Sequence, residues 1–266
     1  MSKFKLAANL AFLFTEKPLL ERFLAAKASG FVGVELGFPY DVPVEKLVQA
    51  RDKAHVEIAL ISMPPGNWDD GDRGLAAIPN RQEEFRESVT TAVQYASALK
   101  CKRLHCLAGL LPENCTDSVR AEYEATYIEN LRYAADILQQ NDIMLLIEPI
   151  STFPRYFLRH QLQGIDVIQK VNRSNLMHQF DIFHAQSTDG NLTSFFDANK
   201  QFMGHVQVGQ VPGRHEPDSH GEVNFPFLFN HLERNGYDAW IGCEYHPKGC
   251  TEDGLEWAAP YLKHQQ

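Results

Sequence analysis

LLIEPI, residues 145–150, is a short apolar run that carries Glu148 where a buried strand should be purely hydrophobic. Three later runs repeat this pattern: HQFDIFH (178–184) carries Asp181, GHVQVGQ (204–210) carries Gln207, and WIGCEYHP (240–247) carries Glu244. Burying an unpaired carboxylate costs several kcal/mol or forces its protonation, so four such placements need a common compensation. One divalent cation, bound where four consecutive strands end, would supply it.

Short β-rich runs alternate with helical patterns along the whole chain, without a low-complexity segment or a linker. Apolar residues between the runs recur with helical spacing, and Thr116 is placed to cap a long helix over residues 116–140. The alternation predicts eight strands, over residues 5–12, 32–36, 57–62, 103–107, 144–147, 177–181, 205–208 and 240–245. Eight β/α units favour a (β/α)₈ TIM barrel that spans residues 1–266 as a single domain.

An open doubly wound sheet is the alternative fold. It is disfavoured because Ala8-Asn9-Leu10-Ala11 follows the first strand, where a Gly-rich phosphate-binding turn would be expected. Catalytic groups of a TIM barrel lie at the carboxyl ends of its strands, and the four polar residues of the second half fall there.

One connection, from Met63 to Asn80, is long and rich in Pro, Gly and Asp. It can be a lid over the site or a surface excursion with a short irregular helix. Arg73 and Trp68 are the residues of this segment that could reach a substrate.

The composition limits the classes of partner that the protein is expected to bind. The formal net charge of −9 and the pI near 5.6 disfavour nucleic acid, which needs a concentrated basic surface. No apolar stretch is long enough to span a membrane. The five cysteines are odd in number and lack C-x-x-C spacing, so we expect neither a disulfide framework nor a structural zinc site, and we expect a cytoplasmic location. A homo-oligomer is possible.

Several segments together carry a family resemblance that none carries alone. They are GVELGFPY (33–40), GDRGLAAIPNR (71–81), LLIEPI (145–150), QFDIFH (179–184), HVQVGQVPGRHEP (205–217) and GCEYHP (242–247). In these the chain resembles hydroxypyruvate isomerases, within the xylose-isomerase-like barrel superfamily that also contains ketose 3-epimerases and endonuclease IV enzymes. The resemblance covers essentially the whole length.

The resemblance implies residue roles. Glu148 and Glu244 match the acid/base glutamates of the family, whereas His184 and Arg214 match substrate-contacting positions. The residues that match its metal ligands are Glu148, Asp181, Gln207 and Glu244. Ketose 3-epimerases commonly have His where Gln207 stands, so this all-oxygen set shifts the expected metal toward Mg²⁺ or Mn²⁺ and away from Zn²⁺.

The reaction implied is the interconversion of hydroxypyruvate and 2-hydroxy-3-oxopropanoate (tartronate semialdehyde) through an enediolate. It needs a base, an acid and a positive charge near both oxygens. The carboxylate of such a small 2-oxo or hydroxy acid needs a cationic partner, for which Arg214 is the first candidate and Arg73 the second. Glu35, at the end of the second strand, either contacts the substrate or supports the site through hydrogen bonds.

Other interpretations remain open at this stage. His184 can be an ordinary core histidine, and Arg214 a loop arginine paired with Glu216 or Asp218. Within enzymes, a ketose or inosose 3-epimerase or dehydratase would use the same glutamates on a neutral polyol. An endonuclease IV-like phosphodiesterase would need more histidine ligands, and a barrel that only binds a metabolite is the non-enzymatic alternative.

Overall fold

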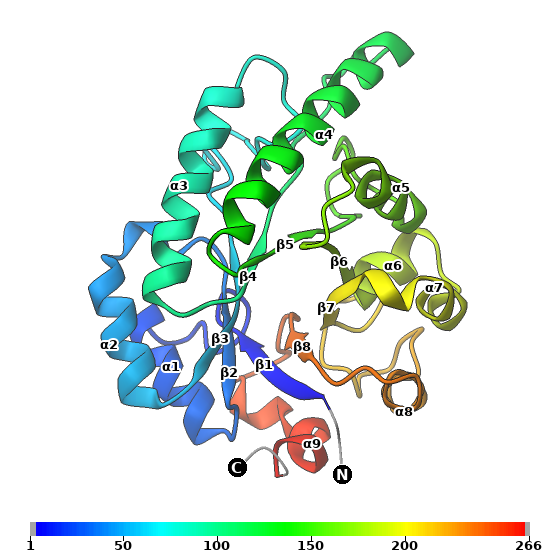
Figure 1. The fold of residues 1–266 in the computed structure, drawn as a ribbon. Helices are drawn as coiled ribbons and strands as arrows, with labels where there is room; N and C mark the ends of the chain where they lie inside the picture. The colour runs from blue at the N-terminus through cyan, green and yellow to red at the C-terminus, as the bar shows by residue number, and fades with distance from the viewer. Residues whose placement is uncertain (1–3, 264–266) are drawn as a thin grey trace.

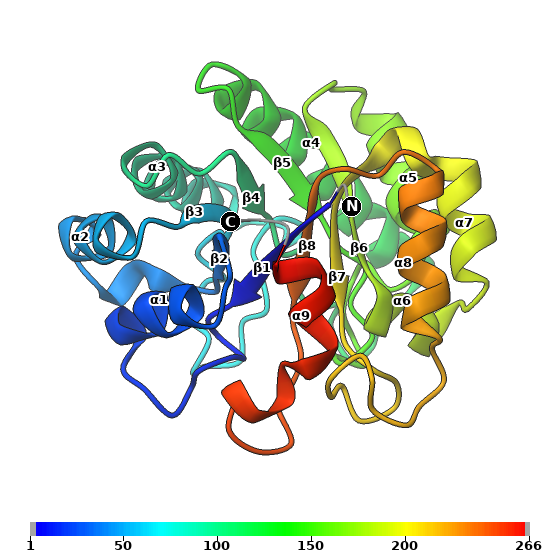
Figure 2. The same cartoon turned by 90° about the horizontal axis from the view of Figure 1, so that it is seen from below.

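The computed structural model describes residues 4–263, which form a closed barrel of parallel strands in the order β1 to β8 (Figure 1). The view from below shows the strands at the centre and the helices around them (Figure 2). The strands are β1 Lys5–Asn9, β2 Gly33–Leu36, β3 Glu57–Ser62, β4 Arg103–His105, β5 Met144–Ile147, β6 Leu176–Asp181, β7 Met203–Val208 and β8 Trp240–Cys243. The predicted TIM barrel is therefore confirmed.

The α-helices are α1 Leu19–Ala28, α2 Val44–Ala54, α3 Gln82–Ala98, α4 Asp117–Gln139, α5 Gln161–Val171, α6 Ile182–Thr188, α7 Leu192–Asn199, α8 Phe225–Arg234 and α9 Ala259–Leu262. Short 3₁₀ helices occupy Pro39–Asp41, Lys200–Phe202, Glu252–Gly254 and Glu256–Ala258. Thr116 caps α4 as predicted, because its hydroxyl accepts a hydrogen bond from the Val119 N–H over 3.3 Å.

β1, β4 and β8 are shorter than the sequence suggested, and two of these shortened ends bear on the site. β1 ends at Asn9, whose carbonyl accepts hydrogen bonds from Phe12 and Leu13 and so turns the chain out of the sheet. β8 ends at Cys243, which leaves Glu244 as the first residue beyond the barrel wall. In both places the backbone stops pairing with a neighbouring strand, and the side chain at the strand end points toward the mouth of the barrel.

The strand register sets the level of the polar residues along the barrel axis. Asp181 pairs with Gln207 across β6 and β7, and Gln207 pairs with Gly242 across β7 and β8. The β2–β3 register shifts between Val34 and Glu35, as it would at a bulge. Such irregularities re-aim side chains beside functional sites.

The long segment from Met63 to Asn80 is tied to the barrel. Arg81 donates two hydrogen bonds to the Asp72 carboxylate, over 2.7 and 2.8 Å, and the Asn67 N–H donates to the same side chain. Gly74 has φ near +112° and approaches the Leu107 carbonyl so closely that a Cβ would collide with it. Because of these anchors, Trp68 is held over the carboxyl end of the barrel.

Among residues 4–263, none of the helices has the length and apolar character required to cross a membrane.

Candidate active site

A cavity of about 350 Å³ opens at the carboxyl end of the barrel. It brings together most of the residues that the sequence singled out: its walls include Glu148, His184, Gln207, Arg214 and Glu244. Wider depressions around Lys102 and around Lys248, of about 400 and 550 Å³, lie elsewhere and contain none of these residues.

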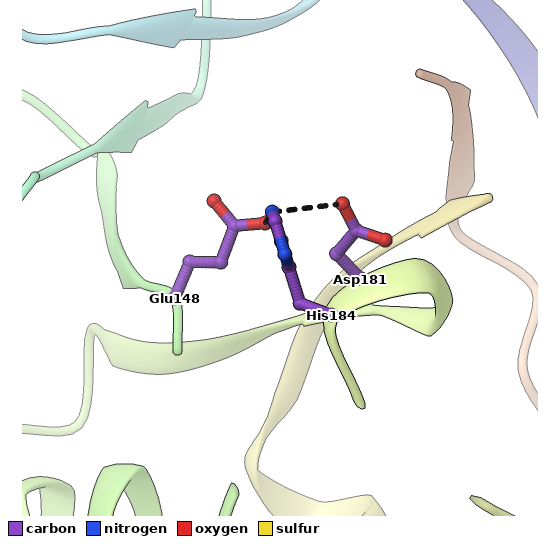
Figure 3. A group of neighbouring side chains, drawn as sticks. All are labelled: Glu148, Asp181 and His184. Atoms are coloured by element: carbon purple, nitrogen blue, oxygen red, sulfur yellow. Dashed lines mark ion pairs between the residues drawn. The ribbon is translucent and has the colours of Figure 1, made fainter. Parts of the chain in front are cut away.

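The acidic residues of the site are crowded. Glu148 follows β5, Asp181 ends β6 and His184 lies in the first turn of α6, and one potential ligand atom from each lies within 4.8 Å of the others (Figure 3). Burial raises the pKa of Glu148 well above its usual range, and the Glu244 and Asp181 carboxylates raise it further. Burial also raises the pKa of Glu244 to about 8, although Arg214 acts in the opposite direction.

Arg214 is the cationic counterpart of these carboxylates. Its Nη2 lies 2.7 Å from Asp181 Oδ2 and 3.4 Å from Glu244 Oε2, and its guanidinium lies between the rings of Phe12 and Phe183, at 4.8 and 4.9 Å. The alternative in which Arg214 is a loop arginine paired with Glu216 or Asp218 is therefore wrong. Its backbone has φ near +50°, an uncommon conformation for a non-glycine residue.

His184 faces the cluster as a hydrogen-bond donor. Its Nδ1 accepts from the Ser151 backbone N–H over 3.2 Å, and burial lowers the pKa of the imidazole to about 3. In the neutral ring the proton is then on Nε2, which lies 3.6 Å from Asp181 Oδ2 and 4.0 Å from Glu148 Oε1. A nitrogen that carries a hydrogen has no lone pair for a metal, so His184 is suited to binding a substrate oxygen.

The donor set that remains consists of oxygens and fits a hard divalent cation. Glu148 Oε1 is buried and has no hydrogen-bond partner among the described residues. It lies in the carboxylate cluster with Asp181 and Glu244, and the Gln207 amide reaches the same cavity. A buried, unpaired carboxylate oxygen is costly unless a cation or donor meets it. The site therefore has the chemistry of a metal site.

Two residues that were predicted to contact the substrate, Glu35 and Arg73, do not line the cavity. Glu35 is fully buried below the cavity, where its carboxylate accepts hydrogen bonds from Asn9, His205 and Gln207, so it does not face a substrate. His205 lies deeper than Gln207 on β7.

Arg73 is also displaced from its expected role. Its guanidinium carbon lies 3.8 Å from the centre of the Trp68 ring and 5.2 Å from that of Phe153. Trp68 and Phe153 line the cavity, whereas Arg73 does not. Together with Phe38, whose ring centre is 5.1 Å from that of Trp68, these rings form the aromatic rim of the cavity. Arg73 stacks on this rim instead of entering the cavity.

The sequence reasoning missed Gln179, which lines the cavity and whose Nε2 donates to Gln207 Oε1 over 2.6 Å. Its signal was present, because Gln179 is a polar residue in an apolar run, two positions before Asp181 and on the same face of the strand. The rim residues Phe38 and Phe153 carried no such signal, since an aromatic residue in a loop has no distinctive chemistry in sequence.

Known proteins are similar to this chain in fold and in sequence. The family model of the xylose isomerase-like TIM barrel matches residues 23–261. The 2-oxo-tetronate isomerase of Pectobacterium atrosepticum is 42% identical, over 97% of this chain and 98% of that protein. The hydroxypyruvate isomerase of Escherichia coli is also 42% identical, over 97% of this chain and 99% of that protein.

Among solved structures, one from Brucella melitensis, titled as an AP endonuclease of family 2, has a TM-score of 0.94 at 46% identity and covers 98% of this chain and 99% of its own. In each of these comparisons the match extends over nearly the full length of both chains. The chain therefore belongs to the xylose isomerase-like TIM barrel family, among relatives that include hydroxypyruvate isomerase and 2-oxo-tetronate isomerase.

Proposed function

We propose that the protein interconverts hydroxypyruvate and 2-hydroxy-3-oxopropanoate by moving a proton between adjacent carbons. The observation that carries the proposal is the pair of glutamates, the buried Glu148 and the partly exposed Glu244, in one small cavity with Arg214. Both have raised pKa values, which suits groups that must take up and release a proton near neutral pH. The names of two close relatives support the same reaction class.

In this proposal one glutamate removes a proton from C3 of hydroxypyruvate, and the enediolate spans C2 and C3. The other glutamate delivers a proton to C2 while the hydroxyl proton of O3 passes to O2, so that the carbonyl moves from C2 to C3. Proton exchange with solvent then returns both glutamates to their starting states. The order of the two glutamates is open, because both have raised pKa values and both lie near Arg214.

A divalent cation would be held by oxygens of Glu148, Asp181, Gln207 and Glu244, and it would stabilise the negative charge that develops on the two substrate oxygens. We propose Mg²⁺, with Mn²⁺ as the alternative, because hard cations prefer carboxylate and amide oxygens.

The substrate carboxylate is assigned to Arg214. Its Nε donates to the Glu244 carbonyl over 3.2 Å and its Nη2 to Asp181, which holds the guanidinium plane in place. Among the described residues Nη1 has no hydrogen bond, so it is free to donate to an anionic substrate. His184 can donate from Nε2 to a second substrate oxygen.

A four-carbon 2-oxo acid is the second candidate substrate, and cavity size favours it. Liquid water occupies about 30 Å³ per molecule, so the cavity has room for about a dozen water-sized groups. A three-carbon acid, with about half that number of non-hydrogen atoms, would leave space below the aromatic rim.

The test is an assay of Mg²⁺-loaded protein with hydroxypyruvate, in which tartronate semialdehyde is followed by coupled reduction. We expect turnover by wild type, abolished by a chelator and restored by Mg²⁺ or Mn²⁺. Glu244→Gln and Glu148→Gln should each lower kcat by about 10² to 10⁴. Glu45→Gln, on the outer helix α2, is the matched control and should keep wild-type activity.

Other substrates in the same assay separate the alternatives. Turnover of 2-oxo-tetronate alone would move the proposal to the four-carbon acid. Turnover of free ketoses alone would transfer it to the epimerase branch, and cleavage of abasic DNA would favour an endonuclease. If none of these compounds is converted, the protein is a binding barrel and the proposed reaction is wrong.

A further inference from the structure

Glu35 is a buried carboxylate that the proposed chemistry does not use. It lies on β2 with no exposed surface, below the cavity. A carboxylate in such a place is costly unless hydrogen-bond donors surround it. The donors around Glu35 show what it does.

Three side chains from two other strands donate to Glu35. Asn9 Nδ2 and Gln207 Nε2 both donate to Oε2, over 2.9 and 2.8 Å, and His205 Nε2 lies 2.5 Å from Oε1. Asn9 has no freedom to reverse its amide, because its Oδ1 accepts from the Ala11 N–H over 3.0 Å. The side of Glu35 that meets Gln207 is therefore an acceptor.

The barrel also makes space for this carboxylate. Gly242 on β8 lies against Glu35, and a Cβ at that position would overlap with the carboxylate oxygens. Gly242 pairs in register with Gln207, so the gap left by the glycine is at the level of the Gln207 side chain.

The contact with Glu35 decides how Gln207 presents its amide. The two ends of a glutamine amide have nearly the same shape, but only the oxygen can bind a cation. A carboxylate accepts and cannot donate, so the NH₂ of Gln207 must face Glu35. The oxygen of Gln207 then faces the other way, toward Gln179, whose Nε2 donates to it over 2.6 Å.

Gln179 lines the same cavity as Glu148 and Glu244. The oxygen of Gln207, which accepts from Gln179, is therefore on the cavity side of its amide.

We infer that Glu35 is a positioning residue: it fixes the polarity of the Gln207 amide, so that the carbonyl oxygen and not the NH₂ group is turned toward the carboxylate cluster. The inference rests on the cation site of the proposed function. It requires no contact between Glu35 and substrate or metal. Groups that orient metal ligands in this way typically change metal affinity about 10- to 100-fold when removed.

The experiment measures Mn²⁺ binding calorimetrically to full-length, metal-freed protein in four forms: wild type, Glu35→Leu, Gln207→Ala and the double variant. Glu35→Leu should weaken binding about 10- to 100-fold in the wild-type background and cause no further loss when Gln207 is already alanine. Equal weakening in both backgrounds, or none in either, would overturn the inference. If wild type binds no Mn²⁺, the proposed cation site itself fails, which is a distinct result.

Two further variants control for damage to the fold. His205→Leu removes a different partner of Glu35 and should leave Mn²⁺ affinity within about threefold. Glu35→Gln keeps the shape of the side chain, and Asn9 still directs the new amide oxygen toward Gln207, so binding should stay near wild type. Combining Glu35→Gln with Asn9→Leu frees both amides to reverse and should weaken Mn²⁺ binding. If this pair also binds normally, Glu35 does not set the polarity, even where Glu35→Leu fails to fold.

Discussion

The guanidinium of Arg214 donates to the carboxylate of Asp181 over 2.7 Å, and both groups are almost completely enclosed by the barrel mouth. Charge-assisted hydrogen bonds of this kind, in a poorly solvated place, fix the position of a side chain as well as stabilise it. Arg214 is therefore oriented before any ligand arrives.

Replacing Arg214 with Met should raise the KM for hydroxypyruvate about 10- to 100-fold, because a hydrogen bond to a charged group contributes about 1.5 to 3 kcal/mol. Mn²⁺ affinity should not decrease, since the substitution removes a positive charge from beside Asp181 and Glu244. Steady-state kinetics and calorimetry measure the two effects separately. Arg214→Lys, which keeps the charge but not the planar fork, should recover part of the lost affinity; an unchanged KM in Arg214→Met would remove Arg214 from substrate binding.

Gln210 holds the loop that carries Arg214. Its buried amide donates to the carbonyls of Pro217, Ser219 and Val223 and accepts from the N–H groups of Val211 and Val223. This amide therefore ties the loop over residues 211–223 to the end of β7.

Gln210→Leu should raise the KM about tenfold and speed proteolytic cleavage within residues 211–223, because several backbone groups lose their partner. Asn175→Leu is the matched control: its amide also donates to two backbone carbonyls, Ala135 and Ile143, but beside the amino end of β6. The control should lose stability without a change in KM. A loop in Gln210→Leu as resistant as in wild type would contradict the prediction.

Trp68 in the aromatic rim should limit substrate length. Trp68→Ala should raise kcat/KM for 2-oxo-tetronate relative to hydroxypyruvate by about tenfold, the discrimination that a hydrophobic contact of about one methylene supplies. Kinetics with both acids measure the ratio. Arg73→Met tests the competing role: if Arg73 only stacks on the rim, the ratio shifts in the same direction, whereas a direct bond to the carboxylate would raise the KM of both acids equally.

His178 should make the fold sensitive to acid. Its Nε2 bonds to Gln161 Oε1 over 2.8 Å, and burial lowers its pKa to about 3. The unfolded chain, with a histidine pKa near 6.5, therefore binds a proton that the folded state rejects over the interval from about pH 6.5 to 3. Stability is complete above pH 6.5 and falls as the pH decreases.

At pH 5, His178 should lower the free energy of unfolding by about 2 kcal/mol relative to its value above pH 6.5. This follows from roughly 1.4 kcal/mol per pH unit. Urea unfolding of wild type and His178→Gln at pH 7 and pH 5 checks it. Other buried histidines add to the total, so the difference between the two proteins isolates His178. Parallel pH dependence in both proteins would show that His178 is protonated in the folded state.

Much of the fold and part of the site could be predicted from the sequence, because the hydrophobic periodicity and the positions of the polar residues indicate the same architecture. The barrel follows from alternating strand and helix patterns, and four strand-end residues stand out because polar groups interrupt apolar runs. The depth of Glu35 could not be predicted, since the β2 register shifts just before it. Arg73 was misplaced because sequence does not show that an aromatic rim takes up its guanidinium. The partner of Arg214, Asp181, could not be predicted because it lies at the end of β6, 33 residues away.

The position of Trp68 makes substrate entry observable without a label. The chain has three tryptophans, and the other two lie away from the cavity: Trp240 begins β8, and Trp257 packs on Phe229. Trp68 is about one-third exposed and stacked on Arg73, so its indole emission should respond to displaced water and to any shift of the guanidinium. Stopped-flow fluorescence can therefore time ligand arrival at the rim separately from the chemistry below it.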